Sequence, residues 1–240
     1  MIYINAAIGA GKTSLAKILS KDLNTHAYLE DPSKIPLLNS FYDDGKVSRE
    51  LKSYAVQMEF LWYRYRQLQK GIEDQRKGMR NTVFDSSLLS DGLMSRNLYN
   101  RGEFPEQFYD DYRKISQIMQ ANVLSSPFNG PDLVIYLDLP FDLMLEHIAQ
   151  RGRKMETTDP KLKEYYHSVW QTYRNWAQSY PDMIMYVDLA KYDFVNSLRD
   201  RVAVLEQIED RLNSLSLLTA DEMTKLEAKH QAMLLDPKTK

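Results

Sequence analysis

Five short segments of the chain are almost continuously apolar and contain β-branched or aromatic residues. Short apolar runs without strict alternation are typical of strands in a parallel sheet that is covered on both faces. The segments are Ile2–Ile4, His26–Leu29, Thr82–Phe84, Leu133–Leu137 and Met183–Val187. The sequence therefore predicts a five-stranded parallel sheet.

The longer stretches between these segments repeat apolar residues at the spacing of an amphipathic helix. Leu15, Ile18, Leu19 and Leu23 form one such face directly after the first strand. Strands that alternate with helices indicate an α/β fold with helices on both faces of the sheet. The further expected helices are Leu51–Gln69, Leu88–Tyr99, Pro105–Leu124, Phe141–Ala149, Leu162–Ala177 and Phe194–Leu212.

The last part of the chain has a different pattern. Ser214–Leu218 reads as a linker, and the sequence from Thr219 to Glu222 has the form of a helix capping box. The pattern predicts one domain over residues 1–212, followed by a linker and an appended C-terminal helix over 213–240. That helix is expected to pack on its own domain or on a partner subunit.

The eight residues from Ala6 to Thr13 fit a phosphate-binding loop, because they join the first strand to the first helix. Gly9 and Gly11 permit a left-handed backbone, although Ala6 stands where the first glycine is usual. Lys12 can reach the β- and γ-phosphates, and the Thr13 hydroxyl can bind Mg²⁺. The residues expected to hold the nucleotide are Ile8, Gly9, Ala10, Gly11, Lys12, Thr13 and Ser14.

An acidic residue follows each of the other four strands, namely Glu30, Asp85, Asp138 and Asp188. In open parallel sheets, ligands bind at the carboxyl ends of the strands, which is also where the phosphate loop lies. Some of these acids can cap helices, and others can bind metal or accept a proton. Both Asp85 and Asp138 have the strand-then-acid form expected of a magnesium ligand.

Composition excludes several classes of site. The chain has no cysteine, so disulfides and zinc–thiolate sites are absent, and its four histidines lack metal-ligand spacing. The formal net charge of −2 gives no reason to expect nucleic acid as a partner. No apolar run is long enough to span a membrane, and no signal peptide is evident, so we expect a cytoplasmic protein.

Five motifs in order resemble those of the deoxyribonucleoside kinase family. The resemblance runs from Met1 to about Leu212, and it implies a P-loop kinase fold with a short lid at about residues 150–160. The motifs are the phosphate loop, Tyr28-Leu-Glu-Asp-Pro32, Tyr54-Ala-Val-Gln57 with Arg64 seven residues later, Val83-Phe-Asp-Ser-Ser87 and Arg151-Gly-Arg-Lys-Met-Glu156.

The resemblance implies an enzyme that phosphorylates the 5′-hydroxyl of a deoxyribonucleoside with ATP and Mg²⁺, for nucleotide salvage. Glu30 would be the general base, and Asp85 rather than Asp138 would bind the metal opposite Thr13. Lys12, with Arg151 and Arg153 of the lid, would stabilise the charge on the transferring phosphoryl group.

The resemblance also implies how the nucleoside binds. Gln57 would pair with the base, and Arg64 would pair with Asp91, which favours a purine or cytosine over thymine. Glu156 and Tyr42 would contact the sugar 3′-hydroxyl, although Tyr42 lies about four residues further from Gln57 than in the relatives.

Two positions depart from the family pattern. Ser86 replaces an arginine that contacts the 5′-hydroxyl, and His147 stands where relatives often have another arginine. Arg96 or Arg101 could replace the missing cation. Two alternatives therefore stay open: a nucleoside monophosphate kinase, and a nucleotide-binding module with little catalysis.

The family resemblance implies a homodimer. Apolar stripes on Leu88–Tyr99 and Pro105–Leu124 could serve a partner as well as the core. The alternative is that these stripes serve the core alone.

Overall fold

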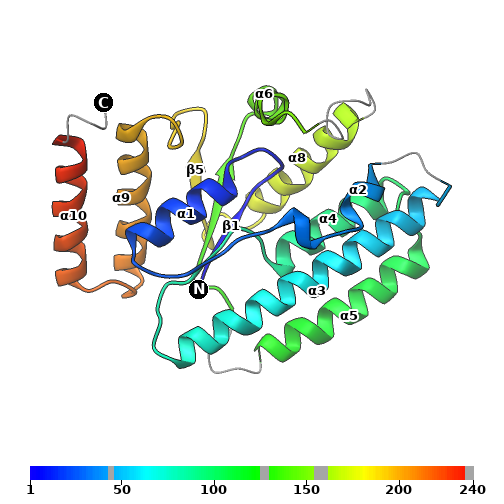
Figure 1. The fold of residues 1–240 in the computed structure, drawn as a ribbon, viewed down its shortest axis with the longest axis horizontal. Helices are drawn as coiled ribbons and strands as arrows, with labels where there is room; N and C mark the ends of the chain where they lie inside the picture. The colour runs from blue at the N-terminus through cyan, green and yellow to red at the C-terminus, as the bar shows by residue number, and fades with distance from the viewer. Residues whose placement is uncertain (43–45, 125–129, 154–161, 236–240) are drawn as a thin grey trace.

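The computed structural model describes residues 1–42, 46–124, 130–153 and 162–235 (Figure 1). Its centre is a sheet of five strands, all parallel, in the order β2-β3-β1-β4-β5. The strands are β1 (Ile2–Asn5), β2 (Ala27–Tyr28), β3 (Val83–Phe84), β4 (Leu133–Asp138) and β5 (Ile184–Asp188). The predicted parallel sheet is confirmed.

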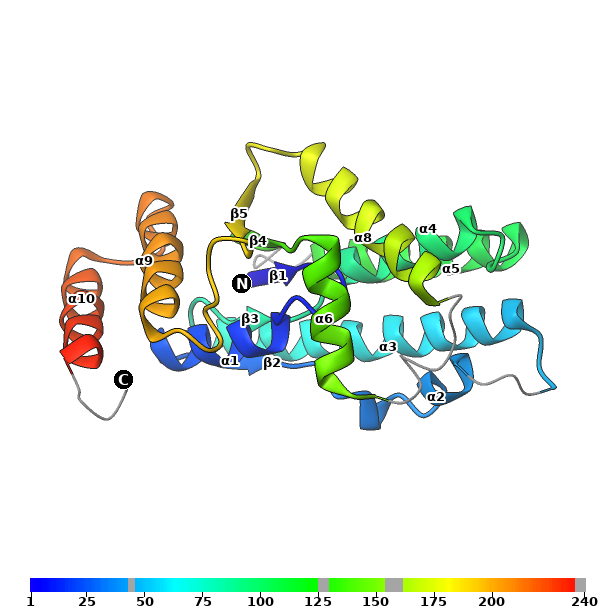
Figure 2. The ribbon, with the colours of Figure 1, turned by 90° about the horizontal axis from the view of Figure 1, so that it is seen from above.

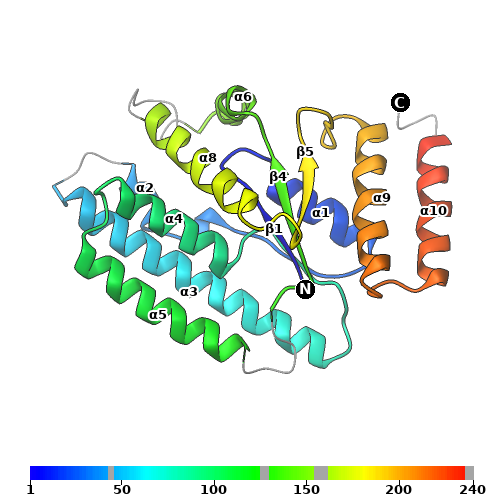
Figure 3. The same cartoon turned by 180° about the vertical axis from the view of Figure 1, so that it is seen from behind.

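Two groups of helices lie on opposite sides of the sheet. Figures 2 and 3 show α9 and α10 on one side and a bundle of α3, α4, α5 and α8 on the other. The helices are α1 (Lys12–Asp22), α2 (Leu38–Phe41), α3 (Arg49–Arg76), α4 (Leu88–Asn100), α5 (Glu106–Leu124), α6 (Phe141–Arg151), α8 (Leu162–Gln178), α9 (Leu198–Ser214) and α10 (Ala220–Leu235), with a 3₁₀ turn at Pro32–Lys34. The α/β fold is therefore as predicted.

The core is built around the central strand. Ile2 and Ile4 of β1 are fully buried. Ile2 pairs in register with Val83 on one side and Leu133 on the other. These apolar side chains hold β1 in the middle of the sheet, and β1 leads directly into the phosphate loop.

Helix α3 is longer than predicted, since it runs from Arg49 to Arg76 and not from Leu51 to Gln69. The Ser48 hydroxyl accepts a hydrogen bond from the Leu51 N–H and so caps its start. The added C-terminal turns are mostly polar, so apolar spacing did not reveal them. Gly71 lies in this extension, and a Cβ there would come within 2.5 Å of the Phe84 ring.

Other predicted boundaries were also wrong, among them those of β2 and α9. Strand β2 has only two residues, although the apolar run His26–Leu29 predicted four. Helix α9 begins at Leu198 and not at Phe194, because Ser197 caps it by accepting from the Asp200 N–H.

The C-terminal helix packs on its own chain, against α9 and the end of α1. The predicted capping box is present: the Thr219 hydroxyl accepts from the Glu222 N–H at 3.2 Å, and the Glu222 carboxylate accepts from the Thr219 N–H at 2.7 Å. Within the described ranges, no helix is long and apolar enough to cross a membrane.

Candidate active site

The phosphate loop has the backbone geometry that its sequence predicts. Gly9 and Gly11 have φ angles of 81° and 82°, in the left-handed region that side chains disfavour. A Cβ on Gly9 would also lie 3.3 Å from Ile148, and one on Gly11 would lie 3.2 Å from the Phe194 ring. Ala6 is not among the described residues with positive φ, so alanine fits there without strain.

Lys12 opens helix α1 and points back over the loop. Its ammonium donates to the backbone carbonyls of Ala6 and Ala7 at 3.0 and 3.1 Å. Burial lowers the pKa of Lys12, and the charges of Glu30 and Asp85 act against this shift. The ammonium thus lies beside the N-terminus of α1, where free backbone N–H groups favour the binding of an anion.

A cavity of about 430 Å³ opens beside this loop, and its size suits a small ligand. The loop, the start of α1, the segments that follow β2 and β3, and helices α2, α3, α4, α6 and α8 contribute residues to its wall. The predicted site residues in its wall are Ile8, Gly9, Ala10, Gly11, Lys12, Thr13, Ser14, Glu30, Tyr42, Gln57, Arg64, Asp85, Arg151 and Arg153. Glu156 lies outside the described residues.

Asp85 joins the phosphate loop to the segment that carries Glu30. Its Oδ2 accepts a hydrogen bond from the Thr13 hydroxyl at 2.7 Å, and its Oδ1 accepts from the Glu30 N–H at 2.8 Å. Burial raises the pKa of Asp85, and these hydrogen bonds oppose the shift. Asp138, the competing metal ligand, is not part of the cavity wall.

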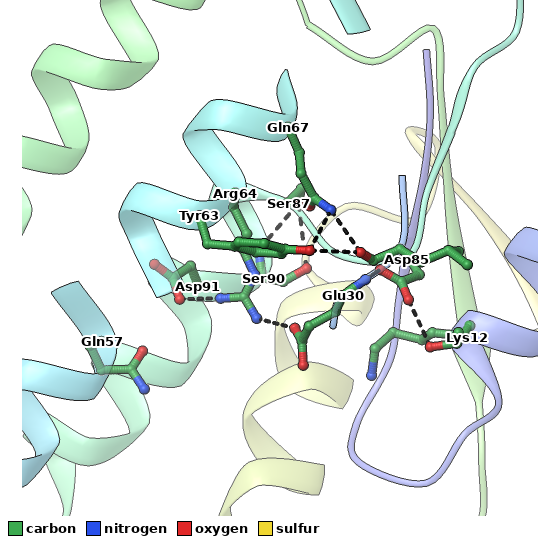
Figure 4. Close-up of polar contacts among 12 residues, drawn as sticks. Lys12, Glu30, Gln57, Tyr63, Arg64, Gln67, Asp85, Ser87, Ser90 and Asp91 are labelled. Carbon is green, nitrogen blue, oxygen red and sulfur yellow. Dashed lines mark hydrogen bonds and ion pairs between the residues drawn. The ribbon is translucent and has the colours of Figure 1, made fainter. Parts of the chain in front are cut away.

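Glu30, Arg64 and Asp91 form a continuous ion-paired chain (Figure 4). Glu30 and Arg64 line the cavity, whereas the predicted site residue Asp91 is fully buried and is not part of the cavity wall. Arg64 donates to Glu30 Oε2 at 2.7 Å and also to Asp91 Oδ1. Burial alone would lower the pKa of Arg64, but the charges of Asp91 and Glu30 outweigh burial and raise it. Burial raises the pKa of Asp91 to about 6, although Arg64 opposes this.

The far part of the cavity has a mixed polar and aromatic wall. Gln57 is buried, and its Oε1 accepts from the Ser95 hydroxyl at 3.1 Å. Phe60 and Tyr165 also line the cavity. A fixed amide beside aromatic rings can bind a flat heterocycle by hydrogen bonding and packing.

Helix α6 and the two residues after it bring a histidine and two arginines to the cavity. The predicted lid, at about residues 150–160, lies outside the described residues from 154 onward. His147 Nδ1 lies 3.0 Å from the Gly9 carbonyl oxygen, so this residue contacts the loop backbone. Arg151 ends α6, Gly152 follows with φ of 67°, and Arg153 comes next, so both arginines reach the cavity wall.

The two arginines that could replace the cation missing at Ser86 do not do so. Arg101 donates to Glu103 at 2.7 Å, and Arg96 is exposed; neither is in the cavity wall. Ser86 is buried in that wall, and its hydroxyl has no hydrogen-bond partner among the described residues. The guanidinium paired with Glu30 is that of Arg64.

Sequence reasoning missed two side chains that hold the segment before Glu30. The Tyr63 hydroxyl and the Gln67 amide both donate to the Leu29 carbonyl oxygen, at 3.1 and 2.7 Å. The two residues lie four positions apart and so share one face of α3. The four-residue spacing of Tyr63 and Gln67 could have indicated a shared role, but such spacing is common in helices.

Three comparisons with known proteins all match this chain to deoxynucleoside kinases. A family model described as deoxynucleoside kinase matches residues 2–213. A deoxyguanosine kinase of Lactobacillus johnsonii is 32% identical over 224 residues, which cover 92% of this chain and 96% of the relative. A deoxyadenosine kinase of Lactobacillus acidophilus is 30% identical over 223 residues, covering 91% and 99%.

The fold is also that of a solved structure. Deoxyadenosine kinase from M. mycoides with bound dCTP superimposes with a TM-score of 0.69 at 24% identity, and the match covers 89% of this chain and 100% of that one. At this identity the likeness bears on the fold alone.

Proposed function

Since this chain belongs to the deoxynucleoside kinase family and is therefore a phosphotransferase that acts on deoxynucleosides, we propose that it phosphorylates the 5′-hydroxyl of a purine deoxynucleoside or deoxycytidine. The family implies ATP as the phosphate donor. The observation that carries the proposal is the position of Glu30. It lines the same cavity as the phosphate loop, Gln57 and Arg64.

In the proposed reaction, the 5′-oxygen attacks the γ-phosphorus while the Glu30 carboxylate accepts the hydroxyl proton. The bond between the γ-phosphorus and the β,γ-bridging oxygen breaks, and ADP leaves. Lys12, Arg151 and Arg153 would stabilise the charge on the transferring group, since all three line the cavity. Phosphoryl transfer depends mostly on such positioning and charge stabilisation.

Thr13 and Asp85 fit a magnesium site. Their oxygens lie 2.7 Å apart beside the phosphate loop, and Mg²⁺ prefers hydroxyl, carboxylate and phosphate oxygens. When bound, the ion would neutralise charge on the β- and γ-phosphates. Asp85 also fixes the Glu30 backbone through its other oxygen. The same side chain would therefore bind the metal and hold the segment that carries the base.

The preference for a purine or cytosine base rests on Gln57 and on the Arg64–Asp91 pair. An amide offers a donor and an acceptor, which match the edge of adenine or cytosine. Replacement of the substrate by thymidine would leave these buried polar groups poorly paired. Glu156 and Tyr42 stay predicted contacts of the sugar 3′-hydroxyl.

Both alternatives are less well supported. A monophosphate acceptor would bring a dianion next to Glu30, where Asp85 and Asp91 already add negative charge and Arg64 is shared between two carboxylates. A non-catalytic module was suggested by Ser86, but Arg64 supplies a cation to Glu30 from another element.

We further propose a homodimer through α4 and α5. Ile118 of α5 is 69% exposed, and Leu89 and Tyr99 of α4 are also exposed. Apolar side chains gathered on one pair of helices are suited to a partner of the same kind. A cytoplasmic location and the absence of a nucleic-acid partner stay predictions.

The function is tested by measuring ATP- and Mg²⁺-dependent phosphorylation of the four deoxynucleosides and of their monophosphates. We expect turnover of deoxyadenosine, deoxyguanosine or deoxycytidine above that of thymidine. Turnover of monophosphates alone would support the first alternative, and tight ATP binding without turnover would support the second.

A further inference from the structure

The Arg64 guanidinium is held between carboxylates from two different elements. Nη2 donates to Oε2 of Glu30, after β2, at 2.7 Å, and Nη1 donates to Oδ1 of Asp91 in α4. The ring of Phe60, one turn earlier on α3, lies 4.6 Å from the guanidinium carbon. The Arg64 side chain is only 8% exposed, so its position is tightly restricted.

The Asp91 end of this link is rigid. Asp91 is fully buried, and its second carboxylate oxygen accepts a hydrogen bond from the Tyr112 hydroxyl at 3.0 Å. Charge-assisted hydrogen bonds from a planar guanidinium are directional, so a fixed Asp91 also fixes the direction of Arg64. The pair is thus unlike an exposed ion pair, whose side chains sample many rotamers.

At the Glu30 end, the position of the carboxylate depends on its ion pair with Arg64. Glu30 follows a strand of only two residues, and its side chain is 28% exposed, so neighbouring apolar atoms do not enclose it. The backbone is held by Asp85, Tyr63 and Gln67 around Leu29 and Glu30, whereas the carboxylate is held by Arg64. Figure 4 shows the other carboxylate oxygen of Glu30 pointing away from Arg64.

We propose that Arg64 is a positioning residue for the base Glu30, in addition to its expected place beside the nucleobase. The inference rests on the proposed function, in which Glu30 accepts the 5′-hydroxyl proton. Arg64 acts through Glu30: it occupies one carboxylate oxygen and leaves the other for the acceptor hydroxyl. A displacement of about 1 Å in a reacting group can lower the rate about 100-fold, so this orientation matters for turnover.

This role makes a prediction that base recognition alone does not make. A residue that only contacts the base changes KM and the ratio of kcat/KM values between substrates. A residue that orients the proton acceptor changes kcat by the same factor for every deoxynucleoside. Lysine in place of arginine retains the charge but not the planar fork, so it cannot bridge Glu30 and Asp91.

The test measures kcat and KM for the four deoxynucleosides in Arg64→Lys, Arg64→Gln and the control Arg66→Gln. Arg66 is an exposed residue on the same helix. We expect kcat to fall at least tenfold in both Arg64 variants, by a similar factor for each substrate, with unchanged ATP affinity. A kcat within threefold of wild type, with losses confined to KM or to one base, would overturn the positioning role.

A double-mutant cycle with Glu30→Gln separates a role through Glu30 from a general structural one. If Arg64 acts through Glu30, Arg64→Lys lowers kcat no further in the Glu30→Gln background. A second, additive loss would overturn the inference, because it would place the effect elsewhere. Thermal unfolding and ATP binding verify that each variant is folded.

The kinase activity and the positioning role of Arg64 are tested separately. A wild-type protein that phosphorylates no deoxynucleoside overturns the proposed function, and the positioning role with it. An active wild type with an unaffected Arg64→Lys variant overturns only the positioning role.

Discussion

His230 of α10 lies with its Nε2 atom 3.2 Å from both carboxylate oxygens of Asp22, the last residue of α1. Lys229 adds an ammonium at 2.7 Å from the same carboxylate, and Glu209 of α9 lies 3.5 Å from His230. Asp22, Glu209 and His230 are buried. The appended helix is thus joined to the phosphate-loop helix by a buried polar cluster.

This cluster predicts an alkaline loss of stability. Burial, with the neighbouring Asp22 carboxylate, raises the pKa of Glu209 to about 9. Glu209 therefore holds a proton in the folded protein near pH 7 but not in the unfolded chain. Its contribution to stability is complete below about pH 4.5 and is lost as pH rises toward 9.

The measurement is the pH dependence of the free energy of unfolding between pH 6.5 and 9. Glu209→Gln should reduce the slope by at most ~1.4 kcal/mol per pH unit, whereas Asp210→Asn, an exposed change on the same helix, should not. Equal slopes in all three proteins would contradict a protonated Glu209.

Glu30→Gln should abolish most of the turnover. The amide keeps the shape of the side chain but cannot accept the hydroxyl proton, so kcat should fall about 100-fold or more while nucleoside affinity changes little. Glu73→Gln, an exposed change on α3, is the matched control. A Glu30→Gln enzyme within threefold of wild type would remove Glu30 from the mechanism.

Asp91→Asn should change base preference. The substitution removes the buried charge that faces Arg64 and leaves an imperfectly paired guanidinium near the base. We expect the ratio of kcat/KM values between thymidine and the preferred substrate to change about tenfold, equivalent to 1.4 kcal/mol. Equal losses on all four deoxynucleosides would argue against a part in specificity.

Ser86→Arg tests whether Arg64 already serves Glu30. A second guanidinium in the same cavity wall would repel Arg64 and compete for the carboxylate, so kcat should fall. Ser86→Ala should be nearly neutral, since the hydroxyl has no described partner. A rise in kcat for Ser86→Arg would instead mean that the protein lacks a needed cation.

Light scattering should show a dimer at micromolar concentration. Ile118→Glu places a charge on the exposed apolar face of α5 and should give a monomer. Leu234→Glu, at an exposed position on α10, should leave the dimer intact. A monomeric wild-type protein would refute the proposed interface.

The sequence predicted the elements whose signal is local. Apolar runs and loop chemistry identified the five strands, the phosphate loop and the capping box, because each depends on neighbouring residues. The end of α3 was missed because its last turns, from Lys70 to Arg76, carry mainly polar helix formers without an apolar period.

The contacts that could not be predicted join residues far apart in the chain. The family resemblance implied the Arg64–Asp91 pair, but the Arg64–Glu30 pair depends on where β2 ends relative to α3. Likewise, the partners of His230, which are Asp22 and Glu209, become apparent only when three helices meet.

The polar cluster around Asp22 also bears on where the folding unit ends. A chain cut after residue 213, the limit of the family match, would lose Lys229 and His230 and would leave the carboxyl groups of Asp22 and Glu209 side by side without these basic partners. Lys229 also donates to the Asp22 carbonyl at the end of α1, where cations are favoured. Deletion of the appended helix should therefore loosen the helix that begins at Lys12, some distance from the cut.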